Sequence, residues 1–428
     1  MALPAPVDPE TKYRLLLKIS QDLSGTLELQ DVLHRLLAAV RGAIPYDAAG
    51  IFVLSRRVPI GHDARSHLIA GMAAVGFGDV PRDDDPMLRS GKGIIGHVIR
   101  TGERVIAPDV RLDPRYVAGR APTLSELAVP IVSNREVIGA LNLESDRLDS
   151  YSPADAELLE FFAVAAAVSI EKAILHQHVL EKQRLEQQLA IAREVQASLL
   201  PAEAPRLAGY DVAGINLPTW AIGGDYFDYI PLAGDRLGLV VADVAGKGVP
   251  AALIMATFRA ALRTELRSGD DLLSVVEEVD RVLLESMDRS RFVTAVFGVL
   301  DPGSGGFAYV NCGHNPPLVL RAGGGGDLLD RGRPALGMLG TWRAETGLAR
   351  LDAGDMLVLY TDGVVELMAP DQVEFGVEGL TGVLRQSAGL PAEQMVTAVV
   401  ESTRAYAGRV GYEDDFTLVV LKRDPGPG

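Results

Sequence analysis

The sequence predicts an α+β protein with more than one domain, and three observations support this. Short apolar runs that suit buried strands, such as Ala48–Leu54 and Leu237–Val241, alternate with longer stretches whose apolar residues recur at helical spacing. The chain has 428 residues, enough for two or three domains that each bury a core. Its 48% hydrophobic fraction argues against a disordered protein.

Composition narrows the possible partners and compartments. The net charge is −16 and no block of Lys and Arg occurs, which argues against nucleic acid as a partner because phosphate binding needs clustered cations. A single cysteine excludes an intrachain disulfide framework and fits a reducing compartment. The longest apolar run, Phe161–Ile170, is too short to span a bilayer, and the N-terminus lacks the apolar core of a signal peptide. We therefore expect a cytoplasmic protein with no membrane partner.

The first 175 residues predict an α+β domain. Residues 1–12 are rich in proline and charge and are expected to be a loose end, with the domain spanning residues 13–175. Helical spacing or strand-like runs mark its elements. The expected helices are Tyr13–Leu23, Leu29–Ala43 and Pro153–Leu175, and the expected strands are Ala48–Leu54, Leu68–Val75, Glu126–Val132 and Glu136–Leu143.

This segment resembles a GAF sensory domain. The resemblance rests on three stretches, Gly91–Val110, Glu126–Ser145 and Tyr151–Ala173. It implies either a sensor for a small molecule or a dimerisation spacer without a ligand, and both remain open. Since the lone cysteine, Cys312, lies outside the segment, a thioether-linked bilin is excluded. Gly91–Gly96 matches the dinucleotide fingerprint G-x-G-x-x-G, but a loop precedes it instead of a strand, so we expect a turn there and no dinucleotide.

A continuous helix is expected from Ile170 to about Leu200, where Pro201 ends it. Apolar and amide residues keep an approximate 3-4 spacing in its second half, which is typical of a coiled coil. These residues are Leu185, Gln188, Ala192, Val195 and Leu199. We expect residues 176–200 to join two copies of the chain as a homodimer; a surface helix packed on one domain is the alternative.

The last half predicts a second α+β domain over residues 201–423, followed by a short tail at 424–428. Antiparallel strands flanked by pairs of helices suggest a layered sandwich with sheets in the middle. The expected helices are the segment after Gly248, Leu272–Met287, Val377–Ser387 and Ala392–Ala407. The expected strands are Leu237–Val241, Phe292–Leu300, Phe307–Asn311, Leu318–Arg321, Met356–Tyr360 and Phe416–Leu421.

Four carboxylates stand beside separate apolar strands in this domain. Asp225 and Asp243 bracket one segment, Asp362 follows the strand Met356–Tyr360, and Asp414 or Asp415 precedes Phe416–Leu421. Carboxylate oxygens are the ligands that Mg²⁺ and Mn²⁺ prefer, and two such ions roughly 4 Å apart can share a hydroxide and clamp a phosphoryl group. A cysteine phosphatase needs an arginine six positions after its cysteine, and position 318 is Leu, so Cys312 is expected to be buried structure.

The region resembles the metal-dependent serine/threonine protein phosphatases (PPM), in the bacterial branch related to stage II sporulation protein E. Six stretches in the family's order give the resemblance: Ala192–Pro201, Gly223–Asp228, Val241–Leu253, Asn311–Leu318, Leu359–Glu366 and Asp414–Leu421. The resemblance implies an α-β-β-α sandwich that binds two Mn²⁺ or Mg²⁺ ions. It also implies that a metal-bound water is the nucleophile, so that no protein side chain attacks.

The resemblance assigns expected roles to single residues. Asp243 would bridge both metals, the carbonyl of Val244 would reach one of them, and Asp225 would be a further ligand. Asp362 and Asp414 would complete the other metal, with Asp414 preferred over Asp415 because it stands three residues before Thr417. Five further residues are expected to support the site: Asp228 as a structural or indirect contributor, Lys247 against phosphate or an acid, His314 and Asn315 as a structural pair or in catalysis, and Asp415.

The expected substrate is phosphoserine or phosphothreonine on a partner protein, by the resemblance often an anti-sigma-factor antagonist, under control of the GAF domain. Two other functions are consistent with parts of the sequence. A GAF-linked nucleotide cyclase would explain GGDYF at Gly223–Phe227 but leaves the later Asp362 and Asp414 motifs unexplained. A non-catalytic partner-binding module on the same fold is disfavoured because every expected carboxylate is present.

Overall fold

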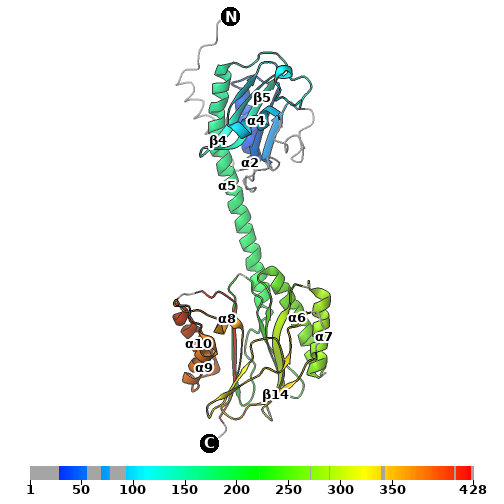
Figure 1. Cartoon of the computed structure of the whole chain (residues 1–428), viewed down its shortest axis with the longest axis vertical. Helices are drawn as coiled ribbons and strands as arrows, with labels where there is room; N and C mark the ends of the chain where they lie inside the picture. The colour runs from blue at the N-terminus through cyan, green and yellow to red at the C-terminus, as the bar shows by residue number, and fades with distance from the viewer. Residues whose placement is uncertain are drawn as a thin grey trace. The chain divides into compact units, whose positions relative to one another are not determined.

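A computed structural model describes residues 28–54, 69–77, 93–220, 222–269, 271–288, 290–338, 343–408 and 411–425. The chain divides into two compact units, Met1–Arg184 and Leu185–Gly428, and the boundary falls inside one helix, α5 (Pro153–Ala197; Figure 1). The expected loose end at 1–12 and helix at Tyr13–Leu23 lie outside the described residues.

Unit 1 is built on an antiparallel sheet with the strand order β2-β1-β5-β4-β3. The strands are β1 (Ala48–Leu54), β2 (Ile69–Val75), β3 (Val105–Ala107), β4 (Ser125–Ser133) and β5 (Glu136–Ser145). Besides α5, its helices are α2 (Leu29–Arg41), α4 (Gly93–Thr101) and the short 3₁₀ helix η1 (Val110–Leu112). The expected helix Leu29–Ala43 and the strands near 48, 126 and 136 are thereby confirmed.

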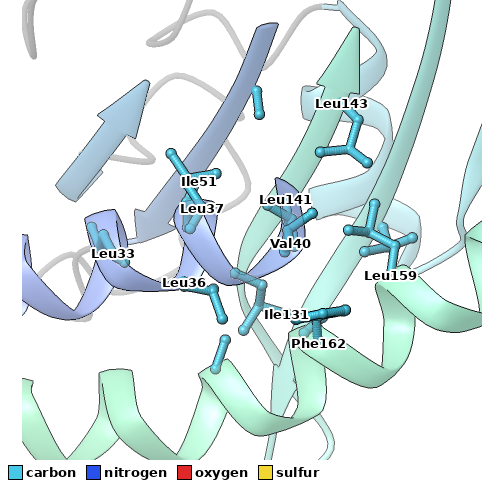
Figure 2. Packing of buried hydrophobic residues seen from close by; sticks show 14 of the residues in the cluster. Leu33, Leu36, Leu37, Val40, Ile51, Ile131, Leu141, Leu143, Leu159 and Phe162 are labelled. Carbon is cyan, nitrogen blue, oxygen red and sulfur yellow. The ribbon is translucent and has the colours of Figure 1, made fainter. Parts of the chain in front are cut away.

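The two faces of this sheet carry different layers. Helices α2 and α5 pack against one face, and Figure 2 shows Leu36 and Val40 of α2 meeting Leu159 and Phe162 of α5 over Leu141 of β5. Alternation along the strands sends the intervening residues to the other face, where α4 packs. The expected turn at Gly91–Gly96 is wrong from Gly93 onward, because Ile94 and Val98 sit one helical turn apart and bury the inner side of α4.

Helix α5 confirms the expectation of one continuous helix beyond residue 170. Large apolar side chains on it remain exposed in this single chain. Val164, Val168, Leu175, Leu185 and Leu189 are between 38% and 69% exposed and fall on one alternating 4-3 repeat. No helix in the described parts of the chain is long and apolar enough to cross a membrane.

Unit 2 is a four-layered α-β-β-α sandwich (Figure 1). The first sheet has the order β13-β10-β9-β8-β7, with β14 also paired to β10, and the second has the order β12-β11-β15-β16-β6. Helices α6 and α7 pack on the first sheet, α9 and α10 on the second, and a third apolar cluster lies between the sheets. The predicted sandwich is confirmed.

The elements of unit 2 lie close to the expected ranges. Its helices are α6 (Val249–Ser268), α7 (Leu272–Ser286), α8 (Asp362–Val365), α9 (Gly376–Gln386) and α10 (Ala392–Ala407). Its strands are β6 (Tyr210–Leu217), β7 (Tyr226–Pro231), β8 (Leu237–Val244), β9 (Val293–Asp301), β10 (Gly306–Cys312), β11 (Leu318–Leu320), β12 (Gly326–Leu328), β13 (Gly332–Arg333), β14 (Gly347–Arg350), β15 (Met356–Tyr360) and β16 (Phe416–Arg423). The sequence had not predicted β6, β7 and the short strands β12 to β14.

Candidate metal centre

Two strand pairs, one in each sheet, bring the four predicted aspartates to their ends. In the first sheet Tyr226 of β7 pairs with Ala242 of β8, so Asp225 lies beside Asp243 where β7 begins and β8 ends. In the second sheet β15 runs into Asp362, and Asp414 stands just before its antiparallel partner β16. Each acidic pair therefore lies at the end of a strand ladder: Asp243 is within β8, whereas Asp225, Asp362 and Asp414 stand one or two residues outside β7, β15 and β16.

Hydrogen bonds from the second sheet hold Asp225, which belongs to the first. Its Oδ2 accepts from the hydroxyls of Thr361 at 2.8 Å and Thr417 at 2.5 Å, and its side chain is buried at 3% exposure. Thr417 also receives a hydrogen bond from Asn216 of β6. Sequence analysis missed this bridging role of the two threonines. The available signal was their position, since Thr361 directly precedes Asp362 and Thr417 stands in the final motif.

Burial, together with repulsion between neighbouring carboxylates, raises the pKa values of these aspartates. Burial and then the charge of Asp243 raise the pKa of Asp225 well above its usual range, although Thr417 opposes the shift. Burial, followed by Asp362 and Asp414, raises the pKa of Asp243 to about 7, and a hydrogen bond with Asp225 opposes it. Burial and Asp414 also raise the pKa of Asp362. Cations placed among these groups would relieve the repulsion.

Oxygen atoms converge where Gly224 lacks a side chain. A Cβ on Gly224 would lie 2.9 Å from the carbonyl oxygen of Val244, 3.3 Å from Oδ1 of Asp243 and 3.5 Å from the carbonyl oxygen of Gly246. Carboxylate and carbonyl oxygens suit a hard divalent cation. Within the described ranges no three acidic, histidine or cysteine side chains by themselves form a group that could hold a metal ion.

Asp414 and Asp415 differ sharply despite being neighbours. Asp415 is 9% exposed, and its two oxygens accept from the backbone N–H groups of Thr219 and Gly224, both at 2.8 Å. Its carboxylate therefore fixes the loop before Asp225. Asp414 is half exposed, and its Oδ1 lies 3.1 Å from Nζ of Lys247, which also donates to the carbonyl of Glu413. Lys247 thus contacts an acid of the site.

The remaining predicted residues surround the centre. Asp228 is buried and contacts Arg263 of α6 at 2.5 Å as well as the Tyr226 hydroxyl, which ties α6 to β7. His314 is held by Thr294, whose Oγ1 lies 2.9 Å from Nδ1, and by Asn311, whose Oδ1 accepts from the His314 backbone N–H at 2.8 Å. Burial lowers the pKa of His314 to about 4. Thr294 pairs with Asp243 across β8 and β9, so His314 contacts a residue that is a direct neighbour of Asp243.

Cys312 is fully buried, as expected, and burial raises the pKa of its thiol to about 12. A thiol with so high a pKa is a poor nucleophile near neutral pH. The structure therefore agrees with the exclusion of cysteine-based phosphatase chemistry.

The last turn of α5 contacts the loop of Asp225 directly. Gln196 donates from Nε2 to the carbonyl of Gly223 at 2.7 Å and accepts from its N–H at 3.1 Å. Arg259 of α6 donates to the carbonyl of Leu199 at 2.7 Å. Sequence analysis had assigned this helix end to the coiled coil and missed Gln196, although the residue lies within the quoted stretch Ala192–Pro201.

A further cation lies near the loop between β8 and α6. Nη1 of Arg291 is 3.9 Å from the point where a Cβ on Gly246 would stand. This nitrogen is buried and has no hydrogen-bond partner within the described residues. Arg291 was not predicted, because nothing in the sequence distinguishes it from other arginines.

Comparison with known families agrees with this geometry. Residues 233–424 match the family model of stage II sporulation protein E (SpoIIE), and residues 26–171 match a GAF domain model. Unit 2 carries a SpoIIE-type phosphatase domain. It follows a GAF domain, as the sequence predicted.

Each of three known proteins is similar to part of this chain. Protein IcfG from Synechocystis sp. is 29% identical over 264 residues, which cover 55% of this chain and 42% of IcfG. Phosphoserine phosphatase RsbU from Bacillus subtilis is 28% identical over 251 residues, covering 56% of this chain and 72% of RsbU. The solved SiaA-PP2C domain of Pseudomonas aeruginosa superposes with a TM-score of 0.51 at 24% identity, covers 57% of this chain and 99% of that domain, and supports the fold of the SpoIIE-type domain.

Proposed function

We propose that this chain is a metal-dependent serine/threonine protein phosphatase under the control of its GAF domain. The observation that carries the proposal is the meeting of four aspartates at the ends of two strand pairs, with Asp225 held across both sheets by Thr361 and Thr417. The SpoIIE-family match supports it independently. A partner-binding module without catalysis would have no need of clustered acids with raised pKa values.

The residues present fit two Mg²⁺ or Mn²⁺ ions. Asp225, Asp243, Asp362, Asp414 and the carbonyl of Val244 are the groups that would hold them. When bound, such ions act as Lewis acids toward a phosphoryl oxygen and lower the pKa of water. The chain's own residues hold this set in place: Asp415 orders the loop of Gly224 through two backbone N–H groups.

Two cations of the chain suit a phosphorylated substrate. Lys247 lies at Asp414 with its side chain 45% exposed, and the Arg291 guanidinium lies beside Gly246. Both can offset the charge of an incoming phosphate among several acids. We extend the named activity of RsbU, a phosphoserine phosphatase, to phosphoserine or phosphothreonine on a partner protein. An anti-sigma-factor antagonist is the partner that the family resemblance favours.

Two features of helix α5 support a homodimer and a means by which the GAF domain could regulate the proposed metal site. Its exposed Val168, Leu175, Leu185 and Leu189 lie on a 4-3 repeat that suits a coiled coil with a second copy of the chain. The same helix ends in Gln196, which holds the loop before Asp225. A change in α5 caused by dimerisation or by a GAF ligand would thereby reach the proposed metal ligands.

The test is phosphate release from an aryl phosphate and from a phosphoserine peptide. The purified chain is assayed with Mn²⁺, with Mg²⁺ and with chelator, beside Asp243→Asn and the control Asp235→Asn. Asp235 is exposed in a loop with φ of +57°, a conformation that Asn accepts readily. We expect metal-dependent turnover in the wild type and the control but not in Asp243→Asn. If turnover resists chelation or survives in Asp243→Asn, the proposal is wrong.

A further inference from the structure

The chain crosses from the first sheet of unit 2 to the second at residues 313–317, between β10 and β11, and His314 lies in this crossing. Gly313 turns the backbone there with φ of +68°, and a Cβ on it would lie 2.8 Å from the backbone nitrogen of Ala335. The side chain of Asn311 closes the turn: its Oδ1 accepts from the His314 N–H at 2.8 Å, and its Nδ2 donates to the His314 carbonyl at 3.0 Å. The backbone of His314 is therefore fixed on both sides of its side chain.

The imidazole ring of His314 contacts a strand of each sheet. Its Nδ1 lies 2.9 Å from Oγ1 of Thr294 in β9, and Thr294 is paired with Asp243 across the ladder of β8 and β9. The same Oγ1 lies 3.5 Å from the backbone carbonyl oxygen of Asp243. From the second sheet, the carbonyl of Tyr360 in β15 acts on the ring as a hydrogen-bond acceptor. Since Tyr360 stands two residues before Asp362, the ring lies between the neighbour of Asp243 and the strand that leads to Asp362.

These contacts decide which ring nitrogen carries the proton. His314 is buried, and burial lowers its pKa to about 4 although the Tyr360 carbonyl opposes the shift, so the ring is neutral near neutral pH. A neutral imidazole has one donor and one acceptor nitrogen. A carbonyl can only accept, and Nε2 has no hydrogen bond to any other group within the described residues. Nε2 therefore carries the proton and faces Tyr360, and Nδ1 accepts from the Thr294 hydroxyl.

The proposed metal ligands come from both sheets, so their spacing depends on how the two sheets pack on each other. The apolar cluster between the sheets packs without directional bonds. Hydrogen bonds are directional, and Thr361 and Thr417 tie Asp225 to the second sheet in this way. His314 supplies a corresponding link for Asp243, through Thr294. Two catalytic ions stand about 3.5–4 Å apart, so a small shift between the sheets would disturb the ligand set.

We propose that His314 is a positioning residue: as a neutral imidazole with its proton on Nε2, it links Thr294 to Tyr360 and so fixes Asp243 relative to Asp362. The ring is buried and does not touch a substrate. The inference rests on the proposed function, since the residues that His314 positions are the proposed metal ligands. It gives a role to the motif Asn311–Leu318, in which Asn311 orients His314 and His314 joins the two sheets.

The experiment compares Mn²⁺ binding to the full chain and to three variants by isothermal titration calorimetry. His314→Asn keeps an acceptor near Thr294, His314→Gln keeps an N–H that can reach Tyr360, and His314→Ala loses both. We expect the Kd for Mn²⁺ to rise at least about tenfold in His314→Ala and less in the Asn and Gln variants. Saturating Mn²⁺ should restore kcat for a phosphoserine peptide in all three, because every proposed ligand is intact. The control His34→Ala, at an exposed position of α2, should bind Mn²⁺ like the wild type.

A second measurement needs no metal. Nitrogen NMR of the imidazole rings in the metal-free chain should show one histidine that stays neutral from about pH 5.5 to about pH 8, with its proton on Nε2. This signal should be missing from the spectrum of His314→Asn, which assigns it to His314.

The outcomes separate this inference from the proposed function. A proton on Nδ1, or an unchanged Kd in all three folded variants of a wild type that binds Mn²⁺, would overturn the inference and leave the proposed function standing. A loss of kcat that saturating Mn²⁺ cannot restore would do the same. Failure of all three variants to unfold cooperatively in calorimetry would show a purely structural role and also overturn it. A wild-type chain with the Nε2 proton that binds no Mn²⁺ would overturn the proposed function, and with it the positioning of metal ligands by His314.

Discussion

Replacing Gln196 with alanine should weaken metal binding without touching any proposed ligand. The substitution removes both hydrogen bonds between the end of α5 and Gly223, two residues before Asp225. Each is worth about 0.5–1.5 kcal/mol net, so the loop would lose about 1–3 kcal/mol of positioning energy. If this whole loss reduces the free energy of Mn²⁺ binding, the Kd for Mn²⁺ should rise about 5- to 150-fold, since 1.4 kcal/mol corresponds to a factor of ten.

The assay is a Mn²⁺ titration of phosphate release from a phosphoserine peptide at saturating peptide. Gln187→Ala is the matched control, because Gln187 is exposed on the same helix. Saturating Mn²⁺ should restore most of the activity of Gln196→Ala, since the ligands themselves are intact. The reasoning is refuted if Gln196→Ala and Gln187→Ala bind Mn²⁺ with the same affinity as the wild type. A loss of kcat that saturating Mn²⁺ cannot restore would also refute it, because the two Gln196–Gly223 hydrogen bonds would then affect the catalytic step and not metal binding.

Three further outcomes follow from the same contacts. In chelator, unit 2 should lose stability as pH rises from about 4 through about 7, because folding raises the pKa of Asp243 from 3.8 to about 7; between pH 5 and pH 8 the loss should be roughly 2–3 kcal/mol, and smaller in Asp243→Asn, as measured by denaturant unfolding at these two pH values. Asp228→Ala should destabilise unit 2 by about 3–5 kcal/mol because it leaves Arg263 without its buried partner, whereas the exposed Glu401→Ala should unfold like the wild type. Leu185→Glu should convert a dimer to a monomer in light scattering, and a wild-type chain that is already monomeric would contradict the coiled coil.

Three of the four aspartates were predictable from sequence because Asp243, Asp362 and Asp414 stand beside strands that the sequence predicts; Asp225 precedes β7, which the sequence did not predict, and only the motif Gly223–Asp228 indicated it. A strand prediction is local, and an acid directly beside a strand end can be read from the chain. The hydrogen-bond donors to Asp225 were not predictable in this way. Thr361 and Thr417 belong to the other sheet, and only the stacking of the two sheets brings their hydroxyls to its Oδ2. Sequence favoured Asp414 over Asp415 only through its distance from Thr417, and it gave no sign that the two side chains make different contacts.

Two buried acids of the GAF domain illustrate a different limit. Alternation along β4 and β5 assigns Leu127 and Leu143 to one face and Glu126 and Glu144 to the other. From sequence alone that pattern indicates a half-exposed sheet with its acids in water. The acids are buried because α4 and its neighbours cover the second face, and such coverage depends on tertiary packing.

The loop between β6 and β7 is where the parts of unit 2 meet. Gln196 of α5 holds Gly223, Asp415 of the second sheet holds Thr219 and Gly224, and Asp225 at its end joins the first sheet. Position 223 of this loop also has no room for a side chain, because a Cβ on Gly223 would lie 2.3 Å from Oδ2 of Asp415. Since Gln196 and Asp415 hold residues of this loop from two other elements, a shift of either one displaces Asp225 relative to Asp243. Control of the proposed metal site would therefore require no contact with the ions, only a change in α5, whose last turn contains Gln196.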